Sequence, residues 1–234
     1  MTAPETPTVA TIGFYLWNDM TMLDVLAPHQ TLGFSPGIET FTFARTTEPV
    51  VSDTGVRIVP DYGLADVPQP DVLLVGGGAN ALTEMADPEV VATIARLGAG
   101  ARYVASVCTG ALILAEAGLL DGYKANTHWA ARAQLAAYPK VEVVTDRVVV
   151  DRDRFTGGGV TAGIDIALTL LGVLLGDETA AFTELLLEYR PAPPYGTGHP
   201  DSSPAELVAA ARGAYAQMAP DIDAFVAGRS GGAQ

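Results

Sequence analysis

The single cysteine of the chain, Cys108, is the residue type best suited to nucleophilic chemistry. It lies in the segment SVCTG (106–110), after an apolar run typical of a strand and before a Leu-bearing run typical of a helix. Small residues at these spacings are characteristic of a nucleophile elbow, a sharp strand-to-helix turn that raises the nucleophile above the sheet edge. Free N–H groups at the helix start favour a thiolate. We therefore predict a reactive thiol rather than the commoner buried structural cysteine.

Two acidic residues are candidates for proton transfer to or from this thiol. Asp24 falls in the first turn of a helix predicted to begin near residue 21 or 22, among apolar neighbours. Burial beside Cys108 would raise its pKa and make it a proton donor, whereas the alternative is a simple contact with the helix dipole. Asp165 lies in an apolar helix that follows a Gly-rich turn. We interpret Asp165 as structural, as a cap or a dimer contact.

Small-residue turns follow three of the predicted strands, at 76–78, 108–110 and 157–159. The first turn lacks the spacings G-x-x-x-x-G-K-[ST] and G-x-G-x-x-G of phosphate-binding loops. We interpret it as a close backbone approach to Cys108, in which the N–H groups of Gly77 and Gly78 stabilise negative charge. A plain strand–helix turn is the alternative.

The three histidines do not have the spacing of metal ligands. His29, His128 and His199 contain no pair that shares one helix face, and no second cysteine is available. Thr109, not histidine, follows Cys108, so a local Cys–His dyad is not indicated. We expect no metal site, a structural His128 and a solvent-facing His199.

Composition narrows the class of protein. The 234 residues are 49% hydrophobic, 17% charged and carry a formal net charge of −14 at pH 7, which argues against binding to nucleic acid or an anionic membrane. One cysteine fits a reducing cytoplasm. The start of the chain has no signal-like pattern, and the apolar run at 164–175 is interrupted by Asp165 and Gly172, so neither secretion nor a membrane span is expected.

Apolar strand-length runs alternate with helical patterns along most of the chain. This alternation predicts an α/β fold with a mainly parallel sheet and helices on both faces. Residues 50–59 read as a β-hairpin, and Pro28 should kink or split the first helix. We expect three parts: a disordered or extended N-terminus at 1–8, one α/β domain at 9–204, and a C-terminal helix and tail at 205–234 packed on that domain.

These motifs together resemble a known family. The acid in MLD (22–24), the turn VGGG (75–78), the elbow YVASVCTG (103–110), the segment TGGGVTAGID (156–165) and EYRPAPP (188–194) are similar to those of the isonitrile hydratases. These belong to the DJ/PfpI branch of the class I glutamine-amidotransferase-like superfamily. The resemblance covers about residues 11–204.

The resemblance implies a flavodoxin-like fold, a cytoplasmic homodimer and a cofactor-free lyase. The small-molecule substrate would be an isonitrile, R–NC, hydrated to an N-substituted formamide. By position, Cys108 corresponds to the nucleophile, Asp24 to the acid/base and Thr109 to the threonine after the cysteine, while Gly77 and Gly78 frame the pocket. A covalent cysteine thioimidate would be the intermediate.

Three departures from the family pattern affect the expected pocket. The segment LDVLAP (23–28) stands where LDLTGP is usual, Gly76 replaces a proline, and Val160 replaces a bulkier isoleucine beside the thiol. We expect these changes to alter the accepted substrate size rather than the reaction. Because Val160 adjoins the thiol, we count it among the substrate-binding residues.

Other functions remain open at this point. A glyoxalase-like enzyme acting on small electrophiles would share the thiol, but it usually pairs the thiol with Glu and a nearby His. A transcription regulator would need a DNA-binding segment, and the chain after Tyr189 is short and not basic. A cysteine-based redox sensor or stress protein is the further alternative.

Overall fold

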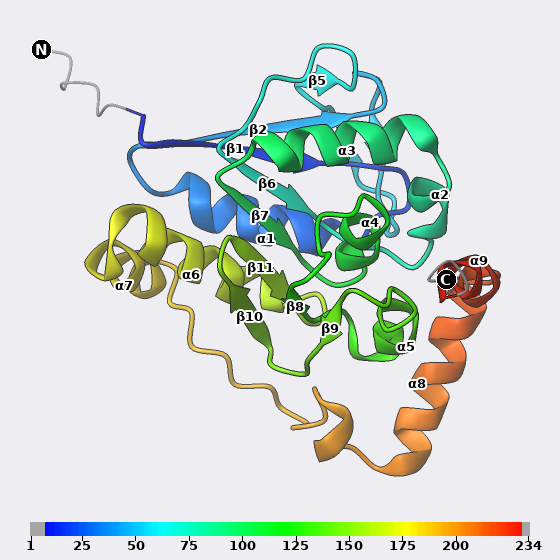
Figure 1. The fold of residues 1–234 in the computed structure, drawn as a ribbon. Coiled ribbons are helices and arrows are strands. Elements are labelled where there is room, and N and C mark those ends of the chain that lie inside the picture. The colour runs from blue at the N-terminus through cyan, green and yellow to red at the C-terminus, as the bar shows by residue number, and fades with distance from the viewer. Residues whose placement is uncertain (1–7, 231–234) are drawn as a thin grey trace, which may run out of the picture.

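The computed structural model describes residues 8–230, so the predicted N-terminal segment, apart from residue 8, lies outside the described residues. A seven-stranded sheet runs through the middle of this part of the chain (Figure 1). Every neighbouring pair in it is parallel except β10–β11. In sheet order the strands are β10 (Val148–Asp151), β11 (Arg154–Gly157), β7 (Tyr103–Ser106), β6 (Val72–Val75), β1 (Ala10–Tyr15), β2 (Ile38–Ala44) and β5 (Tyr62–Gly63).

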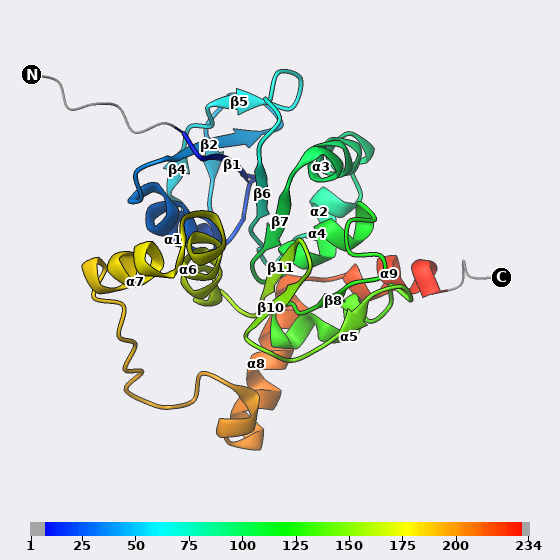
Figure 2. The same cartoon turned by 60° about the vertical axis from the view of Figure 1, so that its left-hand side comes forward.

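Helices cover both faces of this sheet, which confirms the predicted fold class. Figure 2 shows α1 (Met22–Gly33) and α6 (Ala162–Leu175) on one face and α3 (Pro88–Gly100) and α4 (Gly110–Glu116) on the other. The remaining helices are α2 (Leu82–Met85), η1 (Trp129–Ala131), α5 (Arg132–Leu135), α7 (Asp177–Leu186), η2 (Pro200–Ser202), α8 (Ala205–Met218) and α9 (Ile222–Ser230). Two small sheets pair β3 (Val50–Val51) with β4 (Arg57–Ile58) and β8 (Lys124–Ala125) with β9 (Glu142–Val143).

The apolar central strands explain this architecture. All four residues of β6 are buried, and β1 buries five of its six. Fully burying a Val, Leu or Ile side chain is worth about 1.5–3 kcal/mol, so strands apolar on both faces need a helical layer on each side. Val75 pairs with Ser106 and Ser106 with Thr156. The carboxyl ends of β6, β7 and β11 therefore lie at one edge and bring the three predicted turns together.

Several local predictions differ from the structure. Pro28 does not split α1, which is one continuous helix, and the proline packs closely on α6 at Gly163. Gly176, with a φ of 91°, precedes α7, so Asp177 is the first residue of this helix and not its cap. Within the expected C-terminal tail, residues 222–230 form a second helix, α9, whose Ile222 and Val226 are buried in the core.

The tightest backbone packing beside the elbow involves Gly110, the first residue of α4. A Cβ atom there would lie 2.1 Å from the carbonyl oxygen of Val75, which neither backbone can relieve. We expect Gly110→Ala to lower the free energy of unfolding in urea by about 3 kcal/mol. Gly213→Ala is the control: this position in α8 is exposed and open, so the same change should stabilise by about 0.5–1 kcal/mol. Equal shifts in the two variants would contradict the packing argument.

Candidate active site

Cys108 occupies the turn between β7 and α4 with an unusual backbone conformation. Its φ is 57°, in the left-handed region that costs a residue with a side chain roughly 1–3 kcal/mol. Two hydrogen bonds hold it there: its N–H donates to the carbonyl of Gly158 at 2.8 Å, and its carbonyl accepts from the hydroxyl of Thr127 at 2.9 Å. This geometry is that of the predicted elbow. The side chain is buried at the edge where the three turns meet.

The carboxyl group of Asp24 is buried next to the thiol. Asp24 is fully buried, and its Oδ2 accepts a hydrogen bond from the N–H of Gly77 at 2.9 Å. Within residues 8–230, Oδ1 has no hydrogen-bond partner. Burial raises the pKa of Asp24 to about 7, and the charge of Asp53 adds to the rise. Hydrogen bonds from Gly77 and from the thiol of Cys108 oppose it. Asp24 can therefore bind or release a proton near neutral pH.

The thiol itself is not held as a thiolate. Burial raises the pKa of Cys108 well above its ordinary value, and the negative charge of Asp24 raises it further. Hydrogen bonding from the N–H of Thr109 lowers it by less. The expectation of a helix-stabilised thiolate is wrong, because desolvation and a neighbouring carboxylate outweigh the start of a seven-residue helix. At rest the pair is a neutral thiol beside a partly ionised carboxyl group.

Thr109, Gly77 and Gly78 pack against one another rather than lining an open cradle. The N–H of Gly78 donates to the Thr109 hydroxyl at 2.9 Å, and that hydroxyl donates to the Gly78 carbonyl at 2.7 Å. A Cβ atom on Gly77 would lie 2.5 Å from the backbone nitrogen of Thr109. Both glycine N–H groups predicted to stabilise substrate charge are thus already bonded, to Asp24 and Thr109. Here the glycines position the acid and the elbow.

Val160 lies beside the site, in the turn whose Gly158 carbonyl holds the Cys108 backbone. It is half-buried and lines a cavity of about 400 Å³ together with His128 and Arg147. Neither Cys108 nor Asp24 is among the residues lining that cavity. The Val160 side chain therefore faces this neighbouring cavity, and its contact with substrate stays a prediction.

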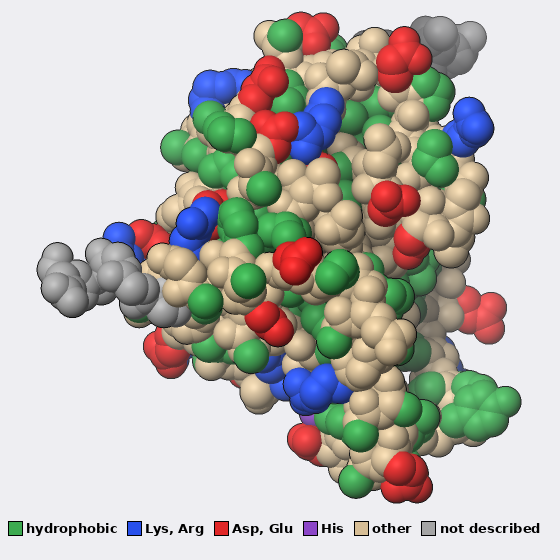
Figure 3. All heavy atoms as spheres, turned by 90° about the vertical axis from the view of Figure 1, so that its right-hand side faces the viewer, with side chains coloured by type: hydrophobic (Ala, Val, Ile, Leu, Met, Phe, Trp, Pro, Cys, Tyr) green, Lys and Arg blue, Asp and Glu red, His purple; other side chains and the backbone are tan. Residues whose placement is uncertain are grey.

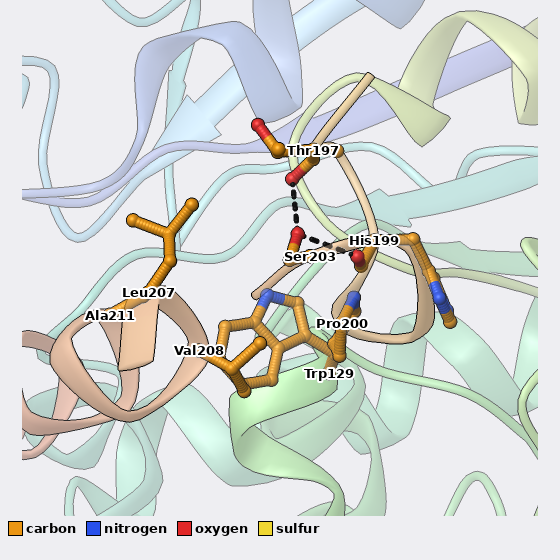
Figure 4. Close-up of a pocket in the computed structure, with 9 residues that line it drawn as sticks. Trp129, Thr197, His199, Pro200, Ser203, Leu207, Val208 and Ala211 are labelled. Atoms are coloured by element: carbon orange, nitrogen blue, oxygen red, sulfur yellow. Dashed lines mark hydrogen bonds between the residues drawn. The ribbon is translucent and has the colours of Figure 1, made fainter. Parts of the chain in front are cut away.

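The histidines and Asp165 have structural contacts. Asp165 accepts hydrogen bonds from Arg147 Nε at 2.8 Å and from the Tyr189 hydroxyl at 3.2 Å, as its interpretation as structural requires. His199 is half-exposed and lines a small cavity with Trp129 at the start of α8 (Figure 4). Among residues 8–230, no three His, Cys, Asp or Glu side chains gather in a group that could hold a metal ion.

Residues 10–172 match the DJ-1/PfpI family. This range contains all seven strands of the central sheet and the turn that carries Cys108. The chain belongs to the DJ-1/PfpI family. An isonitrile hydratase of Pseudomonas putida is 44% identical over 201 residues, which are 86% of this chain and 88% of that protein. The crystal structure of a ThiJ/PfpI family protein from Pseudomonas syringae superposes with a TM-score of 0.90 at 36% identity, over 96% of this chain and 93% of that one.

Other similar proteins are more distant or longer. The HTH-type transcriptional regulator GbdR of Pseudomonas aeruginosa is 32% identical over 195 residues, 80% of this chain, but this chain spans only 53% of that regulator. The crystal structure of Drosophila melanogaster DJ-1beta, at 22% identity and a TM-score of 0.70, covers 76% of this chain and 97% of that one. At that identity the likeness shows the fold alone.

The surface adds two facts about this family member. None of the helices between residues 8 and 230 combines the length and apolarity needed to cross a membrane. On the face that carries the C-terminal helices, Lys and Arg side chains lie scattered among Asp and Glu and form no continuous basic patch (Figure 3).

One buried residue of the site was not found from the sequence. Tyr215 of α8 stacks on His128, with ring centroids 5.7 Å apart, and its hydroxyl has no hydrogen-bond partner in the described part of the chain. The available signal was weak, because Tyr215 is simply the one aromatic residue of an Ala-rich helix. Its distance in sequence from Cys108 concealed its position.

Proposed function

We propose that this protein is an isonitrile hydratase, a lyase that adds water to R–NC and gives an N-substituted formamide without a cofactor. The observation that carries the proposal is the buried pair of Asp24 and Cys108, a proton-transferring carboxyl group against a thiol. The isonitrile hydratase from Pseudomonas putida, 44% identical over most of both chains, supports the substrate class. The terminal carbon of an isonitrile needs a nucleophile and a proton at one place, which this pair supplies.

The first half of the reaction uses the resting state of the pair. The carboxylate of Asp24 takes the proton of the Cys108 thiol, and the sulfur attacks the terminal carbon of the isonitrile. As the C–S bond forms, that carbon becomes carbanion-like and takes the same proton back from Asp24. The product is a thioimidate, R–N=CH–S–Cys108, and Asp24 is again a carboxylate. A buried acid with a pKa near 7 suits both transfers.

The second half consumes water. Asp24 now acts as a base and takes a proton from the water whose oxygen bonds to the thioimidate carbon. The nitrogen gains a proton, which is balanced by the proton that the new C–OH group releases when the adduct collapses. Collapse of this adduct forms the C=O bond and breaks the C–S bond. The leaving thiolate recovers its proton from Asp24, and the formamide departs. Thr109 and Gly78 keep the elbow in place throughout, and Gly77 orients the carboxyl group.

The neutral, buried thiol argues against the redox alternative. Cysteines that oxidise readily are accessible and carry a lowered pKa, whereas Cys108 is 6% exposed and its pKa is raised. A sensor thiol would need the opposite environment. Hydration of a small, neutral substrate that can reach a desolvated thiol fits this environment better.

We further propose a cytoplasmic homodimer, the assembly implied by the sequence resemblance. Exposed apolar side chains gather on α6 and α7, where a second copy could cover them: Val173, Phe182, Leu185 and Leu186. Light scattering is expected to give twice the chain mass of 24.3 kDa. A monomer at micromolar concentration would contradict this part of the proposal.

The test of the function is product analysis with a panel of aryl and alkyl isonitriles. We expect one formamide per isonitrile consumed, with the formamide oxygen labelled when the reaction is run in ¹⁸O-water. A 2-oxoaldehyde serves as the comparison substrate for the glyoxalase-like alternative. Consumption of the oxoaldehyde with no formamide from any isonitrile would assign the chain to that alternative.

A further inference from the structure

The hydroxyl of Tyr215 is a buried polar group that nothing in the fold satisfies. Tyr215 is 8% exposed, and its Oη atom is inaccessible and has no hydrogen-bond partner within residues 8–230. A buried hydroxyl without a partner destabilises the folded state, so its retention calls for a function. The other phenol that the C-terminal helices approach, that of Tyr138, donates to Glu116 at 2.7 Å.

The contacts of Tyr215 lead directly to the elbow. Its ring stacks on His128 at an interplanar angle of 23°. His128 follows Thr127, whose hydroxyl holds the Cys108 carbonyl. The His128 ring also lies against Gly159, where a Cβ atom would come within 2.9 Å of it, next to the residue that accepts the Cys108 N–H. Tyr215 thus packs on His128, and His128 adjoins both segments that hold the Cys108 backbone.

The Tyr215 phenol and the Cys108 thiol interact electrostatically. After burial, the charge of Cys108 is the largest cause of the rise in the pKa of Tyr215, and Asp223 adds to it. The phenol is therefore neutral at any working pH of the enzyme. A neutral phenol can donate a hydrogen bond to an acceptor beside the sulfur.

The C-terminal helices hold Tyr215 in this position. The guanidinium of Arg212 lies over the Trp129 ring at 5.2 Å, and Leu207 and Val208 line the cavity beside that ring (Figure 4). The amide of Gln134 donates to Asp223 at 2.6 Å at the start of α9. Figure 1 shows α8 passing along α5 at the side of the molecule, with α9 reaching back towards α4. Tyr215 belongs to a docked element, not to a free tail.

Hydration of an isonitrile leaves one requirement that Asp24 does not meet. Asp24 delivers a proton to the carbon and later accepts one from water, so the nitrogen needs a donor of its own. We propose that the hydroxyl of Tyr215 is this donor, hydrogen-bonded to the nitrogen of the thioimidate formed on Cys108. The inference rests on the proposed function and assigns one further group to its second half.

The proton balance closes without another reagent. As the water oxygen bonds to carbon, the C=N electron pair moves to nitrogen, which takes the Tyr215 proton. The phenolic oxygen takes the proton of the new C–OH group as the C=O bond forms and the C–S bond breaks. Tyr215 ends each cycle as it began, and the thiolate is reprotonated by Asp24.

The test is Tyr215→Phe, which keeps the ring on His128 and removes only the hydroxyl. With an aryl isonitrile that the wild type hydrates, we expect kcat to fall about 10²-fold or more and KM to change little. Formation of the thioimidate does not need Tyr215, so the variant should accumulate protein heavier by the mass of the isonitrile in acid-quenched intact mass spectra. Its melting temperature should equal or exceed that of the wild type, because the lost hydroxyl had no partner.

Tyr138→Phe is the matched control, since it removes a buried phenol that already donates a hydrogen bond, to Glu116. It should lower the melting temperature and leave kcat unchanged. Wild-type kcat in Tyr215→Phe, loss of kcat without adduct, or an equal loss in both variants would each overturn the role of Tyr215. Absence of formamide with wild-type protein would instead refute the hydratase function itself, and this inference would fall with it.

Discussion

Replacing Cys108 with alanine is expected to abolish formamide formation from every isonitrile that the wild type hydrates. Without the sulfur no thioimidate forms, and water would have to attack the isonitrile carbon unaided. Removing the nucleophile of a covalent mechanism typically costs at least about 10⁴-fold in rate. The measurement is formamide production by chromatography over hours at high enzyme concentration, paired with intact mass spectra that should show no adduct.

Cys108→Ser separates nucleophilicity from volume. Serine keeps nearly the same size and the same strained φ of 57°, but a carboxylate cannot readily deprotonate its hydroxyl. We therefore expect Cys108→Ser to be folded, with a melting temperature close to that of the alanine variant, and equally inactive. Turnover at the wild-type rate in either variant would show that the thiol is not the nucleophile.

Replacing Asp24 with asparagine is expected to lower kcat by about 10²–10⁴-fold, the usual contribution of a positioned acid or base. Asparagine can still accept the Gly77 N–H, but it can neither take the thiol proton nor return it to carbon. In the wild type, activity should rise with pH through about 7, because the first step needs Asp24 as a carboxylate. Asp165→Asn, which changes an acid paired with Arg147, is the control and should retain the wild-type kcat and pH profile.

Asp24→Asn should also stabilise the folded protein at alkaline pH. Burial raises the pKa of Asp24 from 3.8 to about 7, so between these values the folded chain holds a proton that the unfolded chain has released. The free energy of unfolding contributed by Asp24 therefore falls as pH rises from about 4 to 7, and above pH 7 the folded state carries the full cost of a buried carboxylate.

Urea unfolding at two pH values measures this effect. The free energy of unfolding of Asp24→Asn should exceed that of the wild type only slightly near pH 4. The difference should reach on the order of 4 kcal/mol at pH 8, at about 1.4 kcal/mol per pH unit. A stability difference for Asp24→Asn that is equal at pH 5 and pH 8 would mean that the carboxyl group titrates normally.

Much of the fold followed from local patterns in the sequence. Strands such as 72–75 are apolar at every position and can be buried only in a sheet covered on both faces, so strand–helix alternation was enough to predict the layers. The SVCTG segment predicted the elbow because only small flanking residues permit so sharp a turn. The Gly-rich turns marked the strand ends that meet at the site. The position of Asp24 in a first helical turn was also local.

The electrostatic state of the site depended on contacts that no local pattern carries. Cys108 is a neutral thiol because folding buries it against Asp24, a residue from another helix, and this desolvation outweighs the helix start that the sequence displayed. The N–H groups of Gly77 and Gly78 are occupied for the same reason, since their partners come from α1 and the elbow.

Tertiary packing also decided what the C-terminal region does. Nothing in the sequence of α8 places Tyr215 near Cys108, because that position depends on how His128, Trp129 and Gln134 dock the last two helices. The sequence by itself determined which residue can act as a nucleophile and which acid begins the first helix. Their protonation states were decided only by folding, because burial and charge act between residues that the chain brings together from far apart.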